Sequence, residues 1–528
     1  MEIPINATMS EQTRRQFCRF AAASTAGLFL APARRSQRLP NILYILADDL
    51  GYGDVHFLNP KRGKIPTPNI DRLCTQGMTF TDAHSGSAVC SPTRYAVLTG
   101  RYAWRSRLQR GVLTPYQPPL IPPSRITVAS LLRSRGYATA CVGKWHLGWN
   151  WPRENGQPVF DRPVTGGPTE VGFDFYFGVD APNYPPYCFI RNDRTVGIPS
   201  IPKPKEMYGN DGIMLPGWRL DAILPALART SIEFIERSCR GGKPFFLYLP
   251  LTSPHTPLAV AESWKGKSGL GLYGDWVMQT DSVVGEVLQA LDRQGQADNT
   301  LVIFTSDNGC APYIGIDYDV ERPRQGRVRE LEAKGHYPSG PFRGYKSDIW
   351  EGGHHVAFVA RWPGVVKPGT RSEQVICSTD LMATCAEITG ASIPAGAGED
   401  SISILPALKG HAGKALREAT VHHSINGKFA IRQGRWKLAL CPGSGGWTAP
   451  NDQAAASQGL PEVQLYDLAA DPAEQNNLQA QHPKEVERLT ALLQQYVSRG
   501  RSTPGPAQAN DVSVDLWKKS GTNIKRSD

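Results

Sequence analysis

The segment Asn41-Ile-Leu-Tyr-Ile-Leu-Ala47 is a short, mostly apolar run that leads directly into the acidic pair Asp48-Asp49. A run of this length is typical of a β-strand that is buried on both faces of a sheet. The same pattern recurs three times, and each run again leads into polar residues. The recurrences are residues 137–142 before Gly143-Lys144-Trp145-His146, residues 244–250 before Ser253-Pro254-His255, and residues 300–305 before Ser306-Asp307-Asn308-Gly309.

Segments with the apolar spacing of amphipathic helices lie between these runs, at residues 70–78, 128–135, 220–237 and 276–291. Strands that alternate with helices predict an α/β fold in which helices sandwich a mainly parallel sheet. Ligands of such sheets bind beyond the carboxyl ends of the strands. We therefore expect the four polar segments to lie close together.

The sequence pattern changes after Lys409-Gly410. Short alternating segments at 420–423, 429–432, 436–440 and 464–466 are followed by a helical segment at 483–499. This pattern predicts a smaller C-terminal α+β domain over residues 411–500, beside a catalytic domain over residues 39–410. The polar residues 501–528 are typical of a mobile tail.

The first 33 residues have the pattern of a twin-arginine export signal. Arg14-Arg15 precede a weakly apolar stretch at 20–30, which ends in Ala31-Pro32-Ala33 with cleavage expected after Ala33. The alternative is an N-terminal helix of the fold. The signal predicts an exported protein, periplasmic or extracellular, and no apolar window of about 18 residues predicts a membrane span.

The composition excludes several classes of protein. Hydrophobic residues make up 40% of the 528 residues and charged residues 20%, which argues against global disorder. The net charge of +10 is spread without a basic run of five or more, so a nucleic-acid partner is disfavoured. The ten cysteines form no Cys-x-x-Cys pair, which argues against a zinc site made of cysteines.

Cys90 precedes a predicted helix. In Cys90-Ser-Pro-Thr-Arg94, Pro92 suits the first turn of a helix that runs to Gly100. A residue at that position faces unpaired backbone N–H groups and the positive end of the helix dipole, which suits an anionic group. A lone cysteine at a helix start is more often structural than catalytic.

The complete string Cys-x-Pro-x-Arg with Leu98-Thr-Gly-Arg101 resembles the modification signal of the formylglycine-dependent sulfatases, the arylsulfatase type of the alkaline phosphatase superfamily. In these enzymes the cysteine becomes an aldehyde. The resemblance implies an alkaline phosphatase-like fold, hydrolysis of sulfate esters of carbohydrates or aryl alcohols, and a formylglycine-generating enzyme as a partner during maturation. The further matching motifs are residues 47–54, 143–148, 253–255, 306–309, 344–346 with 350–353, and 465–468 with 471–472 and 476–478.

A metal site is predicted at the strand ends. Asp48, Asp49, Asp307 and Asn308 offer only oxygen ligands, which favour a hard divalent ion such as Ca²⁺ over zinc. Each of them alone is more often a turn cap. Because two pairs follow two strands of one predicted sheet, we interpret them as ligands, with residue 90 completing the set.

The resemblance also implies roles for the remaining motif residues. Arg94 would steady the hydrated aldehyde at position 90, whose hydroxyl attacks sulfur. His146 would be the base of the second step, and Lys144 would bind sulfate. His255 and Lys346 would hold sulfate oxygens and protonate the leaving oxygen. Since Lys144 and His146 are two residues apart after a strand, we expect both on one face of an extended chain.

The sequence departs from the family pattern at His354-His355-Val356-Ala357, where an Ile-Arg-Val-Pro type of sequence is common. We interpret the histidine pair as packing residues rather than a metal site, because no acidic neighbours stand at suitable spacing. His56, His84 and His336 are likewise interpreted as structural.

An aromatic-rich region lies between two of the predicted strands. Residues 172–178 and 183–187, with Trp145, Trp149 and Trp151, predict a platform for sugar rings at the rim of the site. The alternative is that these aromatic residues pack the core. With the excess of basic residues, the platform predicts a sulfated mono- or oligosaccharide as the substrate.

Two other functions remain open. A phosphate or phosphonate ester hydrolase of the same fold would generally carry a serine or threonine nucleophile and zinc held by histidines and aspartates. Here the nucleophile position is a cysteine, and the predicted metal ligands include no histidine. A catalytically silent relative that binds sulfated glycans would be expected to lack Cys90, Arg94 or an acid of the metal set, and all are present.

Overall fold

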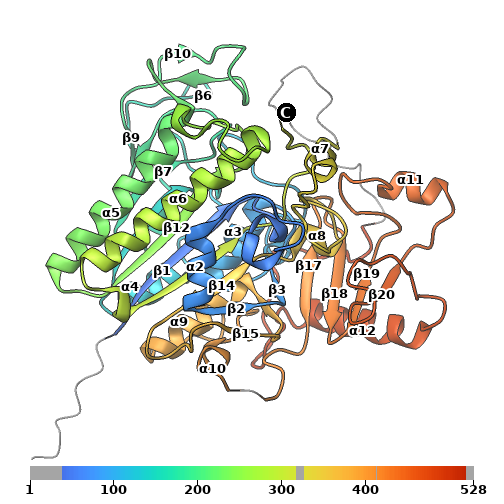
Figure 1. Ribbon diagram of the computed structural model, residues 1–528. Helices are drawn as coiled ribbons and strands as arrows, with labels where there is room; N and C mark the ends of the chain where they lie inside the picture. Colours follow the sequence, from blue (N-terminus) through green and yellow to red (C-terminus); the bar gives the residue numbers. More distant parts are fainter. Residues whose placement is uncertain (1–38, 317–325, 412, 519–528) are drawn as a thin grey trace, which may run out of the picture. The chain divides into compact units, whose positions relative to one another are not determined.

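A ten-stranded sheet organises the larger part of the chain (Figure 1). The computed structural model describes residues 39–316, 326–411 and 413–518. The four predicted strands are the centre of the sheet, in the order β13 (Thr300–Ser306), β1 (Asn41–Asp48), β12 (Phe245–Pro254) and β4 (Ala138–Lys144). All three pairings among them are parallel, as predicted.

The outer strands make the sheet mixed. β7 (Phe175–Val179) continues the parallel order beside β4, whereas β14 (Phe358–Arg361) is antiparallel to β13. The sheet is completed by β2 (Met78–Phe80) and β15 (Thr370–Ser372) at one edge and by β8 (Ile190–Arg191) and β9 (Arg194–Thr195) at the other. Two-stranded pairs form between β3 (Ala83–His84) and β16 (Ile376–Cys377), β5 (Arg153–Glu154) and β6 (Gln157–Pro158), and β10 (Ile201–Pro202) and β11 (Ile213–Met214).

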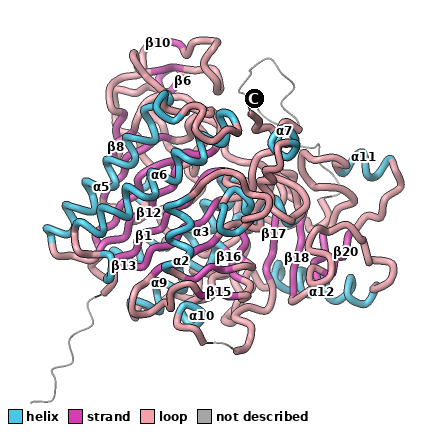
Figure 2. Tube along the Cα trace, in the orientation of Figure 1, coloured by secondary structure: helices cyan, strands magenta, loops and turns pink. Residues whose placement is uncertain are grey.

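Helices cover both faces of the large sheet, and Figure 2 shows its strands between them. Leu43 and Ile45 of β1 pack with α5 (Ile223–Gly241) and α6 (Gly271–Arg293) in one core, beside α2 (Pro68–Gln76). Tyr44, which points to the other face, lies with Leu381 of α9 (Leu381–Thr389). α3 (Cys90–Thr99) and α4 (Val128–Ser134) contact α9. The predicted helices α2, α4, α5 and α6 are therefore confirmed.

The predicted C-terminal α+β architecture is also present. β17 (Thr420–His423), β18 (Phe429–Gln433), β19 (Trp436–Ala439) and β20 (Gln464–Asp467) form an antiparallel sheet in that order. α12 (Pro483–Ser498) packs on β18 and β19 and shares a hydrophobic core with them. The remaining helices are α7 (Val328–Ala333), α8 (Glu351–His354), α10 (Leu405–Leu408) and α11 (Asp452–Ser457).

The polar residues after 500 do not form a free tail over the part that the structure describes. Asp511 pairs with the fully buried Arg101 at 3.0 Å, and Asn510 accepts a hydrogen bond from Arg105 at 3.0 Å. Buried arginines require such partners, which explains why the polar composition was misleading. From Pro40 onward the chain forms one compact unit that contains both sheets.

The predicted export signal, residues 1–33, lies outside the described residues. Among the helices that the structure describes, none is long and apolar enough to cross a membrane.

Candidate active site

The carboxyl ends of the four central strands meet at one buried site. Asp48 ends β1, Lys144 ends β4, His255 follows β12, and Asp307 follows β13, while Cys90 begins α3. This is the arrangement that the strand-end rule predicts. The ten predicted site residues are brought together, and all of them are buried: Asp48, Asp49, Cys90, Arg94, Lys144, His146, His255, Asp307, Asn308 and Lys346.

Asp48 is the centre of one half of the site. Lys144 Nζ donates to both carboxylate oxygens of Asp48, at 3.1 and 2.8 Å. Cys90 Sγ lies 3.8 Å from Asp48 Oδ1. Arg94 bridges to the neighbouring strand, because its Nη2 donates to Asp307 Oδ2 at 2.7 Å and lies 3.4 Å from Asp48 Oδ1.

Asp49 is the centre of the other half. Lys346 Nζ lies 2.7 Å from its carboxylate, and Asn308 Nδ2 donates to its Oδ1 at 2.8 Å. His255 Nε2 lies 3.7 Å from Asp49 Oδ2. Asp49 has a φ of 64° and Ser347, next to Lys346, a φ of 86°. Such left-handed non-glycine backbone costs free energy and is typical of functional sites.

Burial and charge act in opposite directions on the acidic groups. Burial acts to raise the pKa of Asp48, but the surrounding positive charges, Lys144 foremost, hold it below its ordinary value. For Asp307, the effect of burial exceeds the opposing effect of the Arg94 charge and raises the pKa to about 6. Burial also raises the pKa of Cys90 to about 11. The unmodified side chain is therefore a thiol at neutral pH and a poor nucleophile.

The donor set could hold a metal ion. Ligand atoms of Asp48, Asp49, Cys90 and His255 all lie within 4.8 Å of one another. Asn308 Oδ1 is buried and has no hydrogen-bond partner in the described structure. A buried acceptor without a partner is unfavourable by about 1–3 kcal/mol, and a bound cation would satisfy it. Carboxylate and amide oxygens are ligands that Ca²⁺ prefers.

His146 lies on a turn rather than on an extended chain. Its φ of 54° is left-handed, so the expectation that Lys144 and His146 share one face of a strand is wrong, although both line the same cavity. Asp180 Oδ1 holds the turn by accepting from His146 N at 3.2 Å and from Trp149 Nε1 at 3.2 Å. Sequence reasoning missed Asp180, although it follows β7 at the same edge of the sheet.

The imidazole of His146 is oriented by its surroundings. Nε2 lies 2.9 Å from the carbonyl oxygen of Leu113, which assigns the proton to Nε2. Nδ1 is buried and has no hydrogen-bond partner in the described residues. Burial and the charge of Lys144 lower the pKa of His146 well below its ordinary value. The ring is therefore neutral, with a lone pair on Nδ1 that can accept a proton.

A cavity of about 320 Å³ gives access to the site. Cys90, Lys144, His146, His255 and Lys346 line it. The other lining residues come from loops far apart in the sequence, which no strand-end motif marks. Those that sequence reasoning missed include Arg110, Thr114, Tyr208, Tyr313, Ile425 and Trp447.

The predicted aromatic platform is largely wrong. Trp145, Trp149 and Trp151 are only 1%, 2% and 7% exposed, and they do not line the cavity. Trp149 packs against both of the other tryptophans and against Tyr176, so these rings fill the core. Of the aromatic residues in the predicted group, Tyr184 alone lines the cavity. The large apolar area of a tryptophan favours the core unless a ligand site requires the ring.

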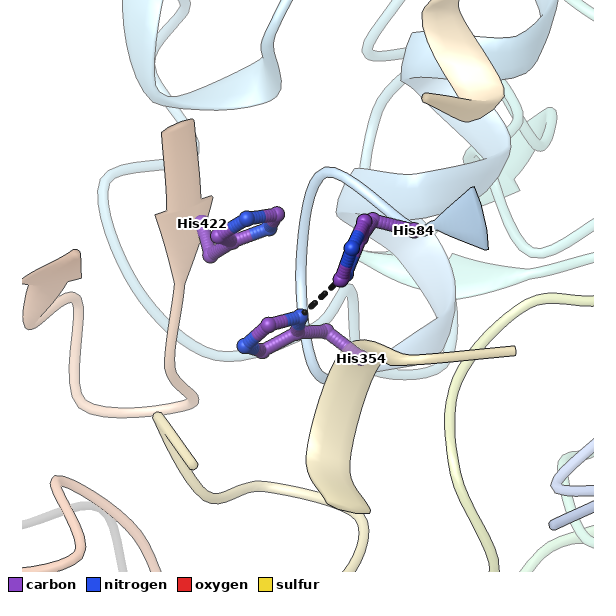
Figure 3. A group of neighbouring side chains, drawn as sticks. All are labelled: His84, His354 and His422. Atoms are coloured by element: carbon purple, nitrogen blue, oxygen red, sulfur yellow. Dashed lines mark hydrogen bonds between the residues drawn. The ribbon is translucent and has the colours of Figure 1, made fainter. Parts of the chain in front are cut away.

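A second group of histidines lies between the two sheets, and we call His84, His354 and His422 the histidine cluster (Figure 3). The rings of His354 and His422 stack at 3.8 Å with an interplanar angle of 7°. Ring nitrogens bind metals in the plane of the ring, so two parallel stacked rings cannot both point at one ion. This geometry supports a packing role, as the sequence analysis inferred.

Hydrogen bonds account for the histidine cluster without an ion. Lys437 Nζ donates to His354 Nε2 at 3.0 Å, the Nδ1 atoms of His354 and His84 lie 3.2 Å apart, and His84 Nε2 lies 2.7 Å from Asp82 Oδ1. These contacts link Lys437, the two histidines and Asp82 in one polar network. His355 binds Glu351, four residues before it, at 2.9 Å, so the expectation that no acidic neighbour stands at suitable spacing is wrong. His336 binds Asp54 at 2.8 Å, a partner from a distant segment that local spacing does not reveal.

The mainly parallel sheet between two layers of helices has the alkaline phosphatase-like fold, and a buried polar site lies at its strand ends. The family model described as Sulfatase matches residues 40–391, and the chain belongs to the sulfatase family. It is a sulfuric ester hydrolase.

Known proteins are similar over most of the chain. An N-acetylgalactosamine-6-O-sulfatase from Bacteroides thetaiotaomicron is 33% identical over 509 residues, which cover 88% of this chain and 94% of that protein. Arylsulfatase A from Homo sapiens is 32% identical over 510 residues, covering 90% of this chain and 92% of that protein. A solved structure from work on glycosaminoglycan metabolism by Bacteroides thetaiotaomicron has a TM-score of 0.75 at 31% identity, covering 87% of this chain and 99% of that chain.

Proposed function

We propose that this enzyme releases sulfate from a sulfated saccharide, using a formylglycine made from Cys90 and a Ca²⁺ ion. The observation that carries the proposal is the position of Cys90, whose Sγ lies 3.8 Å from Asp48 Oδ1 and which groups with Asp48, Asp49 and His255. The similarity to an N-acetylgalactosamine-6-O-sulfatase supports a sugar substrate. The similarity to arylsulfatase A supports aryl sulfates as the alternative substrate class.

Asp48, Asp49, Asp307 and Asn308 would hold the ion together with residue 90. When bound, the ion would neutralise charge on the sulfate group and acidify a hydroxyl of residue 90. The two lysines of the site would bind the substrate. Lys144 and Lys346 point into the cavity and would hold sulfate oxygens, which fixes the ester over residue 90.

His255 and His146 would move protons. Burial and the charge of Lys346 lower the pKa of His255 to about 4, so the ring is neutral in the absence of substrate. A bound sulfate ester would favour the protonated ring, because an opposite charge raises the pKa of a histidine. His255 could then give its proton to the leaving alcohol oxygen. His146, with the free lone pair on Nδ1, would accept a proton in the step that releases sulfate.

We also propose that residues 1–33 direct export by a twin-arginine route to the periplasm or beyond. The paired Arg14-Arg15 and the sequence around Ala33 support this proposal. N-terminal sequencing of the secreted protein should begin after Ala33. Replacement of both arginines by lysine should block export, and unchanged export would contradict the route.

Mass measurement of the peptide that contains Cys90 tests the nucleophile, because conversion to formylglycine lowers the residue mass. Hydrolysis should then be compared between 6-O-sulfated N-acetylgalactosamine and nitrophenyl sulfate, by the sulfate released, and the 6-phosphate of the same sugar, by the phosphate released. We expect kcat/KM to be highest for the sulfated sugar. A clear preference for the aryl ester would overturn the sugar assignment, and a preference for the phosphate would overturn the sulfatase assignment.

A further inference from the structure

The C-terminal subdomain contributes an aromatic wall to the active-site cavity. Trp447, in the segment between β19 and β20, lines the same cavity as Cys90 and Lys346. Its ring lies 6.0 Å from that of Tyr313, centroid to centroid, and Tyr313 lines the cavity too. The two residues of the wall follow strands of different sheets, β13 and β19. This separation explains why no local pattern predicted the wall.

The backbone around Trp447 is fastened to the backbone around Lys346. Trp447 N donates to Ser347 Oγ at 3.0 Å and to Asp348 Oδ1 at 3.1 Å, and Ile349 N donates to Ser444 O at 2.7 Å. A Cβ atom at Gly446 would lie 2.5 Å from Ser347 O, so glycine is required for this close approach. The backbone of Trp447 therefore has a fixed position relative to the backbone beside Lys346.

Trp447 presents carbon atoms to the cavity. The side chain is half-buried, and its Nε1 is shielded from solvent with no hydrogen-bond partner in the described structure. The ring surface that remains accessible is therefore apolar. Arg110, Thr114 and Asn183 add polar groups to the lining, beside apolar residues such as Val112 and Ile425. A cavity with one aromatic wall and several polar groups suits a pyranose, which has an apolar ring face and a rim of hydroxyl groups.

We propose that Trp447 is a specificity-determining residue, which packs against the sugar ring while Lys346 holds the sulfate group. This inference rests on the proposed sulfatase function and makes the C-terminal subdomain part of the substrate site. Because the aromatic wall contacts the sugar and not the sulfur, its loss should act on KM more than on kcat.

Steady-state kinetics of Trp447→Ala and Trp447→Phe on two esters test the proposal. The esters are 6-O-sulfated N-acetylgalactosamine and ethyl sulfate, which has no ring. We expect Trp447→Ala to lower kcat/KM for the sugar ester about tenfold more than for ethyl sulfate, mainly through KM. Trp447→Phe keeps an aromatic face and should recover most of the loss. Trp436→Ala removes another half-buried tryptophan of the same subdomain, away from the cavity, and should not change the ratio.

Equal losses on the two esters would mean that Trp447 only supports the fold near Lys346, and this result would overturn the proposal. Titration calorimetry tests the role of Trp447 separately from the proposed sulfatase function. The sulfated sugar should bind Cys90→Ala, and adding Trp447→Ala should weaken binding about tenfold. If the wild-type enzyme cleaves neither ester, the proposed function is wrong, while unchanged sugar affinity in the double variant contradicts the role of Trp447 by itself.

Discussion

At the scale of single residues, Asp180 positions His146, the proposed base. Its carboxylate accepts a hydrogen bond from the backbone of His146, where φ is 54°. We predict that Asp180→Ala lowers kcat about tenfold, because the imidazole loses its fixed orientation. Asp180→Asn keeps an acceptor oxygen and should restore most of the activity. Equal losses in the two variants, measured as kcat with a sulfated sugar, would argue against positioning through this hydrogen bond.

Cys90 carries the second prediction at this scale. Cys90→Ala should abolish turnover while changing the melting temperature by no more than about 2 °C, because little buried volume is removed. Cys90→Ser should also be severely impaired, since serine cannot form a hydrated aldehyde. Assays of sulfate release and thermal unfolding on the same preparations check both statements. Repeated turnover by the serine variant would refute the formylglycine mechanism.

At the scale of elements, the central strands and their helices follow directly from the sequence. The predicted run 300–305 is β13 at 300–306, and the predicted segment 128–135 is α4 at 128–134. The strand is recognisable because burial on both faces leaves an uninterrupted apolar run, and the helix because burial of one face leaves apolar residues at helical spacing. The same logic places Asp48, Lys144 and Asp307 together, since strand ends of a parallel sheet share one edge.

Local patterns fail where distant segments meet. The turn at His146 depends on Asp180, and the cavity wall depends on Trp447, neither of which is marked by periodicity. The tryptophans after β4 were misplaced because composition does not distinguish a ring in the core from a ring at a ligand site.

The histidine cluster gives a pH-dependent prediction at this scale. Burial lowers the pKa of all three histidines, well below the ordinary value for His354 and His422, although Glu351 opposes the shift at His84. The unfolded chain takes up protons near pH 6.5 and the folded chain does not. The free energy of unfolding should therefore fall as the pH decreases below about 6.5, by on the order of 1 kcal/mol per pH unit for each histidine.

Denaturant unfolding between pH 7 and 5.5 measures this slope. His422→Gln removes one titrating ring and should show a smaller loss of stability over this range. His482→Gln, at an exposed position, serves as the control and should keep the wild-type slope. A wild-type slope in His422→Gln would contradict the prediction.

At the scale of the whole molecule, metal removal should be visible in both activity and stability. We predict that prolonged chelation abolishes turnover and lowers the melting temperature, because a ligand that binds only the folded state stabilises it. Ca²⁺ should restore both better than Zn²⁺, given the oxygen donors. Asn308→Ala should reduce the rise in melting temperature with Ca²⁺, and the exposed Asn476→Ala should not. If metal analysis of the purified enzyme finds mainly zinc, the assignment of Ca²⁺ is wrong.

The burial of Cys90 limits when the proposed formylglycine can be made. Cys90 is only 2% exposed in the folded chain and begins α3, which is buried along its length. A modifying enzyme would therefore need to reach the thiol before α3 packs into the fold. We expect conversion to require an unfolded or nascent chain, and the folded, unconverted protein to be a poor substrate for that enzyme.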